Sequence, residues 1–152
     1  MAMAQAAPGA DVVAAAAPFK YFKAGDLEAD AKALQAKPGN KNLVDQSATI
    51  PCAVVMTTEA HHSATEFEWH EGRDHIVQIF EGSTLYEIGG TPKGNHVNKG
   101  AGEWLAPSSE GSKSIMMGKG DMLVIPRGTP HKRSTEDSVT LFLISSYGAM
   151  KT

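Results

Sequence analysis

The sequence predicts an all-β protein, an antiparallel sandwich or barrel, with one short helix near its N-terminus. Short stretches rich in β-branched and aromatic residues follow one another from about residue 43 to residue 145. Clusters of glycine, proline, asparagine and serine separate these stretches. No helical pattern lies between them, which disfavours alternating strand–helix units and favours antiparallel strands joined by turns.

The expected strands follow from these boundaries. They cover residues 50–57, 65–70, 75–80, 84–88, 113–117, 121–125, 132–134 and 139–145. Residues 89–111 contain six glycines and are expected to form a long loop or an extended hairpin. Loops of this length are often functional lids or variable insertions.

A helix is expected over residues 26–36, with Asp26 as its N-cap. Leu27, Ala31 and Leu34 fall at i, i+4 and i+7, so they lie on one apolar face. The Pro-Gly pair that follows ends the helix. We expect this helix to pack on the outside of the β-structure, in a structural role.

Length and composition exclude several classes of protein. The chain has 152 residues and a formal charge of -3, so it fits one domain that buries its own core. Its lysines and arginines are scattered, which argues against a nucleic-acid partner. No apolar run approaches the roughly 18 residues of a membrane span. The single cysteine, Cys52, excludes an internal disulfide and is interpreted as a small buried hydrophobe.

Residues 1–18 are rich in alanine and interrupted by proline and glycine. We expect them to form a disordered tail, followed by a short strand at residues 19–22 and a single domain over residues 19–152. The tail lacks a basic segment before its apolar stretch, unlike a signal peptide. A cytoplasmic protein is favoured, and a secreted or periplasmic protein whose signal has been removed is the alternative.

Three of the six histidines stand out as candidate metal ligands: His70, His75 and His131. Glu68 and His70 are two residues apart in a predicted strand, so their side chains point to the same face. The turn at residues 71–74 can return the chain in a hairpin that brings His75 close to His70. Imidazoles that converge beside a carboxylate suit Fe, Mn, Ni, Cu or Zn.

Residues 120–131 carry the most specific pattern, Gly-Asp-Met-Leu-Val-Ile-Pro-Arg-Gly-Thr-Pro-His. This segment resembles the second motif of the cupin family: glycine, five residues, proline, one residue, glycine, two residues, histidine. Every fixed position is filled, and the last of them is His131. The resemblance extends over roughly residues 65–145.

The first cupin motif is matched with two exchanges. His75 lies seven residues before Gly82, where the family usually has glutamate. His70 matches the second histidine of the family's pair, and Glu68 stands at the first. The set of three histidines and one carboxylate is therefore kept, although two members have exchanged strands.

The resemblance implies an antiparallel jelly-roll cupin barrel that encloses a site of ligand size. It also implies one divalent transition metal (Fe, Mn, Ni or Zn), held by His70, His75 and His131 with Glu68 as a fourth ligand. Cupins are commonly homodimers, and we expect the same here.

The resemblance further implies a metal-dependent enzyme acting on a small organic molecule. Three neutral histidines favour a dioxygenase, whereas an added carboxylate favours a lyase or isomerase. Glu68 or Glu66, if not bound to the metal, is the candidate general base. The alternative is a non-catalytic cupin that binds a metal or small ligand, and a purely structural barrel is the third interpretation.

Other polar and aromatic residues have open roles. His61 and His62 are expected in a loop, either solvated or at the barrel mouth. Tyr86 either stacks on an organic ligand or fills the core. Arg127 either meets an anionic substrate or is solvated, and Asp74 either accepts a hydrogen bond from a ligand histidine or belongs to its turn.

Overall fold

The computed structural model describes residues 19–151, and the predicted tail at residues 1–18 lies outside them. The described elements follow in the order α2 (Ala24–Ala36), β1 (Gly39–Val44), β2 (Cys52–Ser63), β3 (Phe67–His70), β4 (Arg73–Ile88), β5 (Thr91–Lys93), β6 (Val97–Gly100), β7 (Glu103–Ala106), β8 (Ser108–Glu110), β9 (Lys113–Gly118), β10 (Met122–Ile125) and β11 (His131–Tyr147). Within this range no helix is long and apolar enough to cross a membrane.

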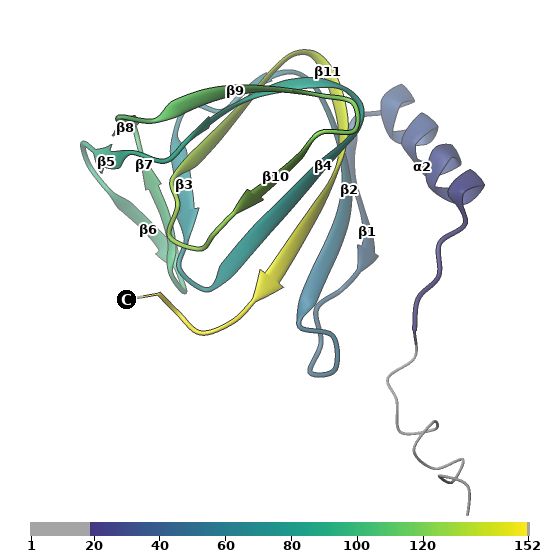
Figure 1. Ribbon diagram of the computed structural model, residues 1–152, viewed down its shortest axis with the longest axis horizontal. Helices are drawn as coiled ribbons and strands as arrows, with labels where there is room; N and C mark the ends of the chain where they lie inside the picture. The colour runs from purple at the N-terminus through teal and green to yellow at the C-terminus, as the bar shows by residue number, and fades with distance from the viewer. Residues whose placement is uncertain (1–18, 152) are drawn as a thin grey trace, which may run out of the picture.

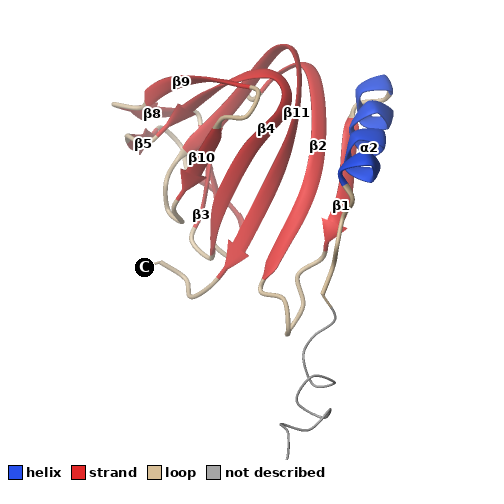
Figure 2. Ribbon diagram, turned by 45° about the vertical axis from the view of Figure 1, so that its right-hand side comes forward, coloured by secondary structure: helices blue, strands red, loops and turns tan. Residues whose placement is uncertain are grey.

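All strand pairs are antiparallel, and the two longest strands organise them. β11 pairs with β2 on one side and with β4 on the other, while β4 also pairs with β10 and β9. β3, β7 and β6 continue the sheet, and β5 pairs with β8 in a separate ribbon. The strands curl around a common interior and α2 lies outside them (Figures 1 and 2). The predicted jelly-roll barrel with an external helix is confirmed.

The helix α2 attaches to the barrel through a small apolar cluster. Ala31 is 1% exposed and packs with Leu43 of β1 and Met56 of β2. Leu27 and Leu34 pack against the same cluster, as the predicted stripe requires. The helix begins at Ala24, earlier than predicted, and its N-cap is a lysine without a side-chain capping bond. The predicted strand at residues 19–22 is also wrong, since these residues form no ladder.

A change of register within β4 allows both of its halves to face the interior. His75, Val77 and Ile79 are buried at odd positions, whereas Thr84 and Tyr86 are buried at even ones. Gly82 lies between the two sets with φ +79. A Cβ there would lie 2.2 Å from the carbonyl oxygen of Ser138. Glycine is therefore required at this position, close to the bulge at Phe80, where the ladder with β11 skips one residue and the alternation shifts.

Several strand boundaries differ from those predicted. Residues 75–80 and 84–88 were predicted as two strands but belong to one continuous strand, β4. Residues 132–134 and 139–145 likewise belong to one continuous strand, β11. β1 was not predicted, and the expected loop at residues 89–111 contains β5, β6, β7 and β8. These short strands have little hydrophobic alternation of their own and pair with strands as short as themselves: β5 with β8, β6 with β7, and β7 with β3.

Candidate metal centre

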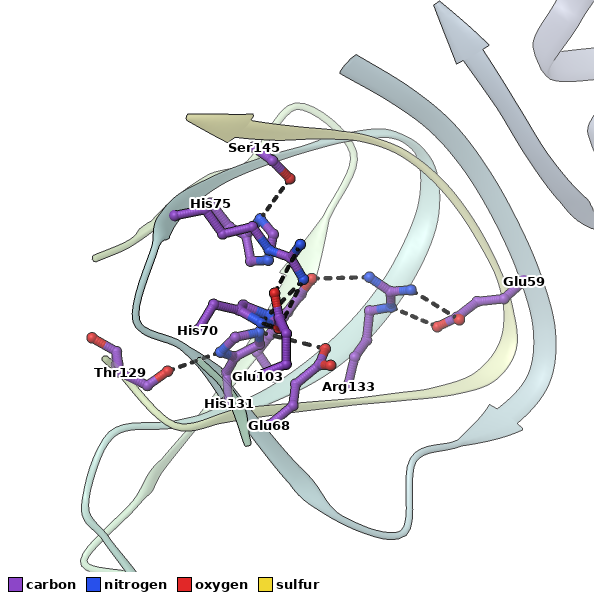
Figure 3. A network of polar contacts seen from close by, with 11 residues as sticks. Glu59, Glu68, His70, His75, Glu103, Thr129, His131, Arg133 and Ser145 are labelled. Atoms are coloured by element: carbon purple, nitrogen blue, oxygen red, sulfur yellow. Dashed lines mark hydrogen bonds and ion pairs between the residues drawn. The ribbon is translucent and has the colours of Figure 1, made fainter. Parts of the chain in front are cut away.

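His70, His75 and His131 meet in the interior of the barrel. Each offers one ring nitrogen, and these atoms all lie within 4.8 Å of one another. The three residues are 4%, 5% and 5% exposed, and their ring centroids are separated by 4.7 to 5.6 Å. Figure 3 shows the three side chains gathered with their polar neighbours.

Three strands supply these histidines. His70 ends β3, His75 lies near the start of β4, and His131 opens β11. The backbone N–H of Gly128 donates to the carbonyl oxygen of His70 at 2.7 Å, which ties the turn before β11 to the end of β3. Gly128 has φ +80, a conformation that favours glycine. The Pro-x-Gly turn thus places His131 beside His70.

Each histidine is held through its Nδ1 atom. Nδ1 of His70 contacts Oε2 of Glu103, Nδ1 of His75 lies 3.1 Å from Oγ of Ser145, and Nδ1 of His131 donates to the carbonyl oxygen of Thr129 at 2.9 Å. These contacts leave the Nε2 atom of each ring to face a ligand. Metal-binding histidines are commonly oriented in this way, through a bond from the other ring nitrogen.

Nε2 of His70 tests whether a metal fits this site. The atom is buried and has no hydrogen-bond partner among the described residues. Its Nδ1 contacts a carboxylate oxygen of Glu103, which can only accept, and lies 3.1 Å from Nη2 of Arg73, which can only donate. The contact with the carboxylate is the closer one, so the proton lies on Nδ1 and Nε2 carries a lone pair. A buried acceptor without a partner is costly. A metal ion bound by the three Nε2 atoms would satisfy it.

Two of the three imidazoles, those of His70 and His75, have the charge state that a metal requires. Burial lowers the pKa of His75 to about 3, and the neighbouring His70 and His131 lower it further. Burial and the charge of Arg73 lower the pKa of His70. Both rings are therefore neutral at pH 7, as metal ligation requires.

A cavity of about 480 Å³ adjoins the histidines, which is within the usual range for small-molecule sites. Its lining includes His75, His131 and Glu68 at one end and Glu59, Tyr86 and Arg133 beyond them. Apolar side chains fill the wall between: Val77, Leu105, Ile125 and Leu143.

No protein-family model and no curated protein matches the sequence. Among solved structures, BH2720 from Bacillus halodurans has a TM-score of 0.58 at 14% identity, over 88% of this chain and 86% of that chain. NMB1881 from Neisseria meningitidis has a TM-score of 0.50 at 13% identity, over 77% and 96%. A cupin-2 domain protein from Shewanella frigidimarina has a TM-score of 0.45 at 14% identity, over 70% and 78%.

The residues of the second motif occupy β10, the following turn and the start of β11 within this jelly roll. The fold is therefore the jelly-roll barrel that the resemblance to cupins predicted.

Glu68 lies at the edge of this three-histidine centre. It pairs in register with His131, and its Oε1 atom is 3.6 Å from Nε2 of that ring. Interaction with His131 lowers the pKa of Glu68 to about 2, against the opposing effect of burial. The group of converging ligand atoms consists of one nitrogen from each of the three histidines. The carboxylate of Glu68 is adjacent to this group and does not belong to it. Ligation by Glu68 stays a prediction.

The remaining predicted site residues lie farther from the triad. Glu66 is exposed at the wall of the cavity, together with His62. His61 and His62 belong to β2, so their predicted loop is wrong. Nδ1 of His61 contacts the carbonyl oxygen of Glu136 at 2.7 Å, outside the cavity lining. The general-base role of Glu66 stays a prediction.

Arg127 and Asp74 form an ion pair. The Arg127 guanidinium donates to both carboxylate oxygens of Asp74, at 3.1 and 2.7 Å. Its backbone N–H donates to the same carboxylate at 2.8 Å. The pair joins the start of β4 to the turn before β11. Among the described residues, Asp74 therefore accepts from Arg127 and from no ligand histidine. Arg127 is 23% exposed and lies outside the cavity lining, so it is not directed at a substrate in the cavity.

Sequence reasoning missed the ion pair behind His70. Glu103 of β7 pairs in register with His70 of β3, and its two oxygens each lie 3.1 Å from a guanidinium nitrogen of Arg73. Glu103 thereby links the imidazole of His70 to the guanidinium of Arg73. No local signal marks Glu103, because it lies in a glycine-rich segment and 33 residues separate it from His70.

Proposed function

We propose that this cupin is a metal-dependent enzyme that binds one divalent transition metal and acts on a small organic molecule in the adjoining cavity. The observation that carries the proposal is the arrangement of the triad. Each Nδ1 atom has a partner and each Nε2 atom is left to face a ligand, including the buried, unpartnered Nε2 of His70. Three imidazole nitrogens suit Fe, Mn, Ni or Zn.

When bound, the metal would supply Lewis acidity, or with iron the activation of O₂. His70, His75 and His131 would hold it, and the apolar wall of the cavity would exclude water from the substrate. Glu68 is ionised at neutral pH because its pKa is lowered to about 2. Its position beside His131 allows it to accept a proton from a bound substrate, which favours lyase or isomerase chemistry.

A dioxygenase is the second candidate. The three converging nitrogens without a carboxylate among them support it, since a three-histidine centre leaves more coordination positions open for a substrate and O₂. The two candidates predict different readouts. A lyase or isomerase exchanges a substrate proton with solvent, whereas a dioxygenase consumes O₂.

Metal content tests the site itself. Protein purified without a chelating tag is expected to bind one metal ion per chain, and alanine at His70, His75 or His131 is expected to remove most of that affinity. His96→Ala is the matched control, because His96 is exposed and lies against Trp69 outside the triad. Full metal occupancy in a triple-alanine variant would refute the proposal. Bound metal without turnover on any substrate would favour the non-catalytic alternative.

We further propose a homodimer. Met116, Met122 and Val124 of β9 and β10 are 65%, 59% and 58% exposed. Burial of such side chains between two subunits would remove apolar surface from water. Sedimentation velocity distinguishes a dimer from a monomer, and Met122→Lys is expected to weaken a dimer that uses this face.

A further inference from the structure

A second polar cluster lines the cavity beyond the histidines. Arg133 follows His131 by two residues on β11, so both side chains share one face of the strand. Tyr86 pairs in register with Arg133 across β4 and β11. Glu59 reaches the same point from β2 (Figure 3). All three side chains line the cavity.

Glu59 neutralises Arg133 and fixes its orientation. Nε and Nη2 of Arg133 donate to the two oxygens of Glu59 at 2.7 and 3.0 Å. Thr135 donates to Oε1 of the same carboxylate at 2.7 Å. Burial raises the pKa of Glu59, but the bonds and charge of Arg133 outweigh it and lower that pKa overall. The pair is therefore ionised at both ends and carries no net charge.

Hydrogen-bond donors remain unused around this pair. Nη1 of Arg133 donates to the hydroxyl oxygen of Tyr86 at 3.1 Å. The hydroxyl proton of Tyr86 finds no acceptor within residues 19–151. Arg133 uses three N–H groups in these bonds out of the five that a guanidinium carries, which leaves two. Tyr86 is 2% exposed, so its donor can be used only by a molecule inside the cavity.

The charges distinguish what the two ends of the cavity can hold. A divalent metal on the three histidines outweighs the single negative charge of the adjacent Glu68, so this end keeps a net positive charge and favours an anionic oxygen. At the other end, the positive charge of Arg133 is already compensated by Glu59. A second anionic group there would be repelled by that carboxylate, whose side chain is only 16% exposed. An uncharged oxygen can accept the free hydrogen bonds without this cost.

We propose that Tyr86 and Arg133 form a specificity subsite for an uncharged carbonyl or hydroxyl oxygen, and that the substrate is a short oxo- or hydroxy-carboxylic acid. Its carboxylate binds at the histidine end, and its second oxygen accepts from Tyr86 and Arg133. The side chains of Val77, Ile125 and Leu143 contact the carbon chain between. This inference rests on the proposed function, because the metal supplies the positive end.

Three probes of similar size test the subsite on zinc-loaded protein by isothermal titration calorimetry. They are 4-oxopentanoate (one carboxylate and one ketone), pentanoate (one carboxylate) and butanedioate (two carboxylates). The expected order places 4-oxopentanoate first, about 5- to 10-fold tighter than pentanoate, the gain typical of one or two hydrogen bonds. Tyr86→Phe should reduce that preference to twofold or less while pentanoate affinity stays constant. Tyr21→Phe is the matched control, since Tyr21 is 75% exposed.

Glu59→Gln tests the charge argument separately. It keeps the shape of the side chain but leaves Arg133 with an uncompensated charge, so the preference should shift at least fivefold toward butanedioate. A purely structural role of Glu59 would weaken all three probes equally. Thermal melting checks that each variant is folded.

Equal affinities for 4-oxopentanoate and pentanoate in the parent protein would overturn the subsite, as would a preference that survives Tyr86→Phe. Binding of none of the probes by protein that holds zinc would also overturn it, while leaving the metal centre intact. Failure of the protein to bind zinc or any of the other proposed metals would refute the proposed function and this inference together.

Discussion

Replacing Glu103 by glutamine tests whether the ion pair behind His70 orients a metal ligand. The carboxylate accepts from Nδ1 of His70 and pairs with Arg73 through both oxygens, at 3.1 Å each. Oε2 of Glu103 contacts both Nδ1 of His70 and Arg73, whereas Oε1 contacts Arg73 alone. A glutamine is uncharged and keeps one acceptor oxygen in place of two, so in either orientation of the amide one of these contacts loses its acceptor. Whichever group loses its acceptor then faces an amide NH₂. His70 is thereby left less well oriented and less basic.

The expected loss of metal affinity is about 10- to 100-fold, as for other partners of ligating histidines. This range corresponds to about 1.4 to 2.7 kcal/mol. The measurement is a competition titration of zinc against a chromophoric chelator, with the melting temperature of each variant recorded alongside. Stability should also fall, because Arg73 already has a buried Nε atom without a partner among the described residues.

Glu81→Gln is the matched control. Glu81 also pairs with a cation, Lys119 at 2.8 Å, but both side chains are largely exposed and the pair lies on the outside of the barrel. Neither metal affinity nor melting temperature should change measurably, since exposed ion pairs contribute little. If Glu103→Gln kept the parent affinity within about twofold and was folded, the orienting role of Glu103 would be wrong.

Three further predictions concern the site and the fold. Glu68→Gln should lower metal affinity markedly if the carboxylate is a ligand, because an amide oxygen is a poorer ligand. If Glu68 is a general base, only turnover should fall. Unchanged affinity together with unchanged turnover would remove Glu68 from the site. In chelator-treated protein the pKa of His75 is lowered to about 3, so the unfolded state binds more protons between about pH 6.5 and 3 and stability falls as pH falls through that window. From pH 7 to pH 5 this effect should cost about 2 kcal/mol in urea denaturation, and a His75→Gln variant that showed the same slope would contradict it. Gly82→Ala should destabilise the fold by several kcal/mol, because the new Cβ would lie 2.2 Å from the carbonyl oxygen of Ser138. Gly89 has φ +80 and nothing within 4 Å of an added Cβ, so Gly89→Ala should cost about 1 kcal/mol of backbone strain alone.

Much of the candidate site follows from short stretches of sequence. The second motif places glycine, proline and glycine where the chain must turn, and residues 120–131 fold as those residue types require. The two-residue spacing of Glu68 and His70 puts both on the face toward the site, because strand geometry alternates. The apolar stripe of α2 predicts which side of that helix packs. These features are local, so a single segment determines each of them.

The partners of these residues depend on register between distant strands. Glu103 meets His70 because β7 pairs with β3, and Arg133 meets Tyr86 because β11 pairs with β4. Nothing within a glycine-rich segment or a short polar stretch indicates such a pairing. The contribution of Glu59 likewise requires that β2 lie on the other side of β11.

The sequence by itself thus determined the main strands of the barrel, the turns of the second motif and the identity of the three candidate histidines, since each is written in neighbouring residues. Only the tertiary structure decided that Glu103 and Arg73 contact His70 and that Arg127 pairs with Asp74. It also decided that Arg133 and Tyr86 face the cavity. The physical reason lies in β4 and β11. The bulge at Phe80 and the register shifts in β11 set which side chains of these two long strands face inward, and those shifts depend on contacts between strands that are far apart in the chain.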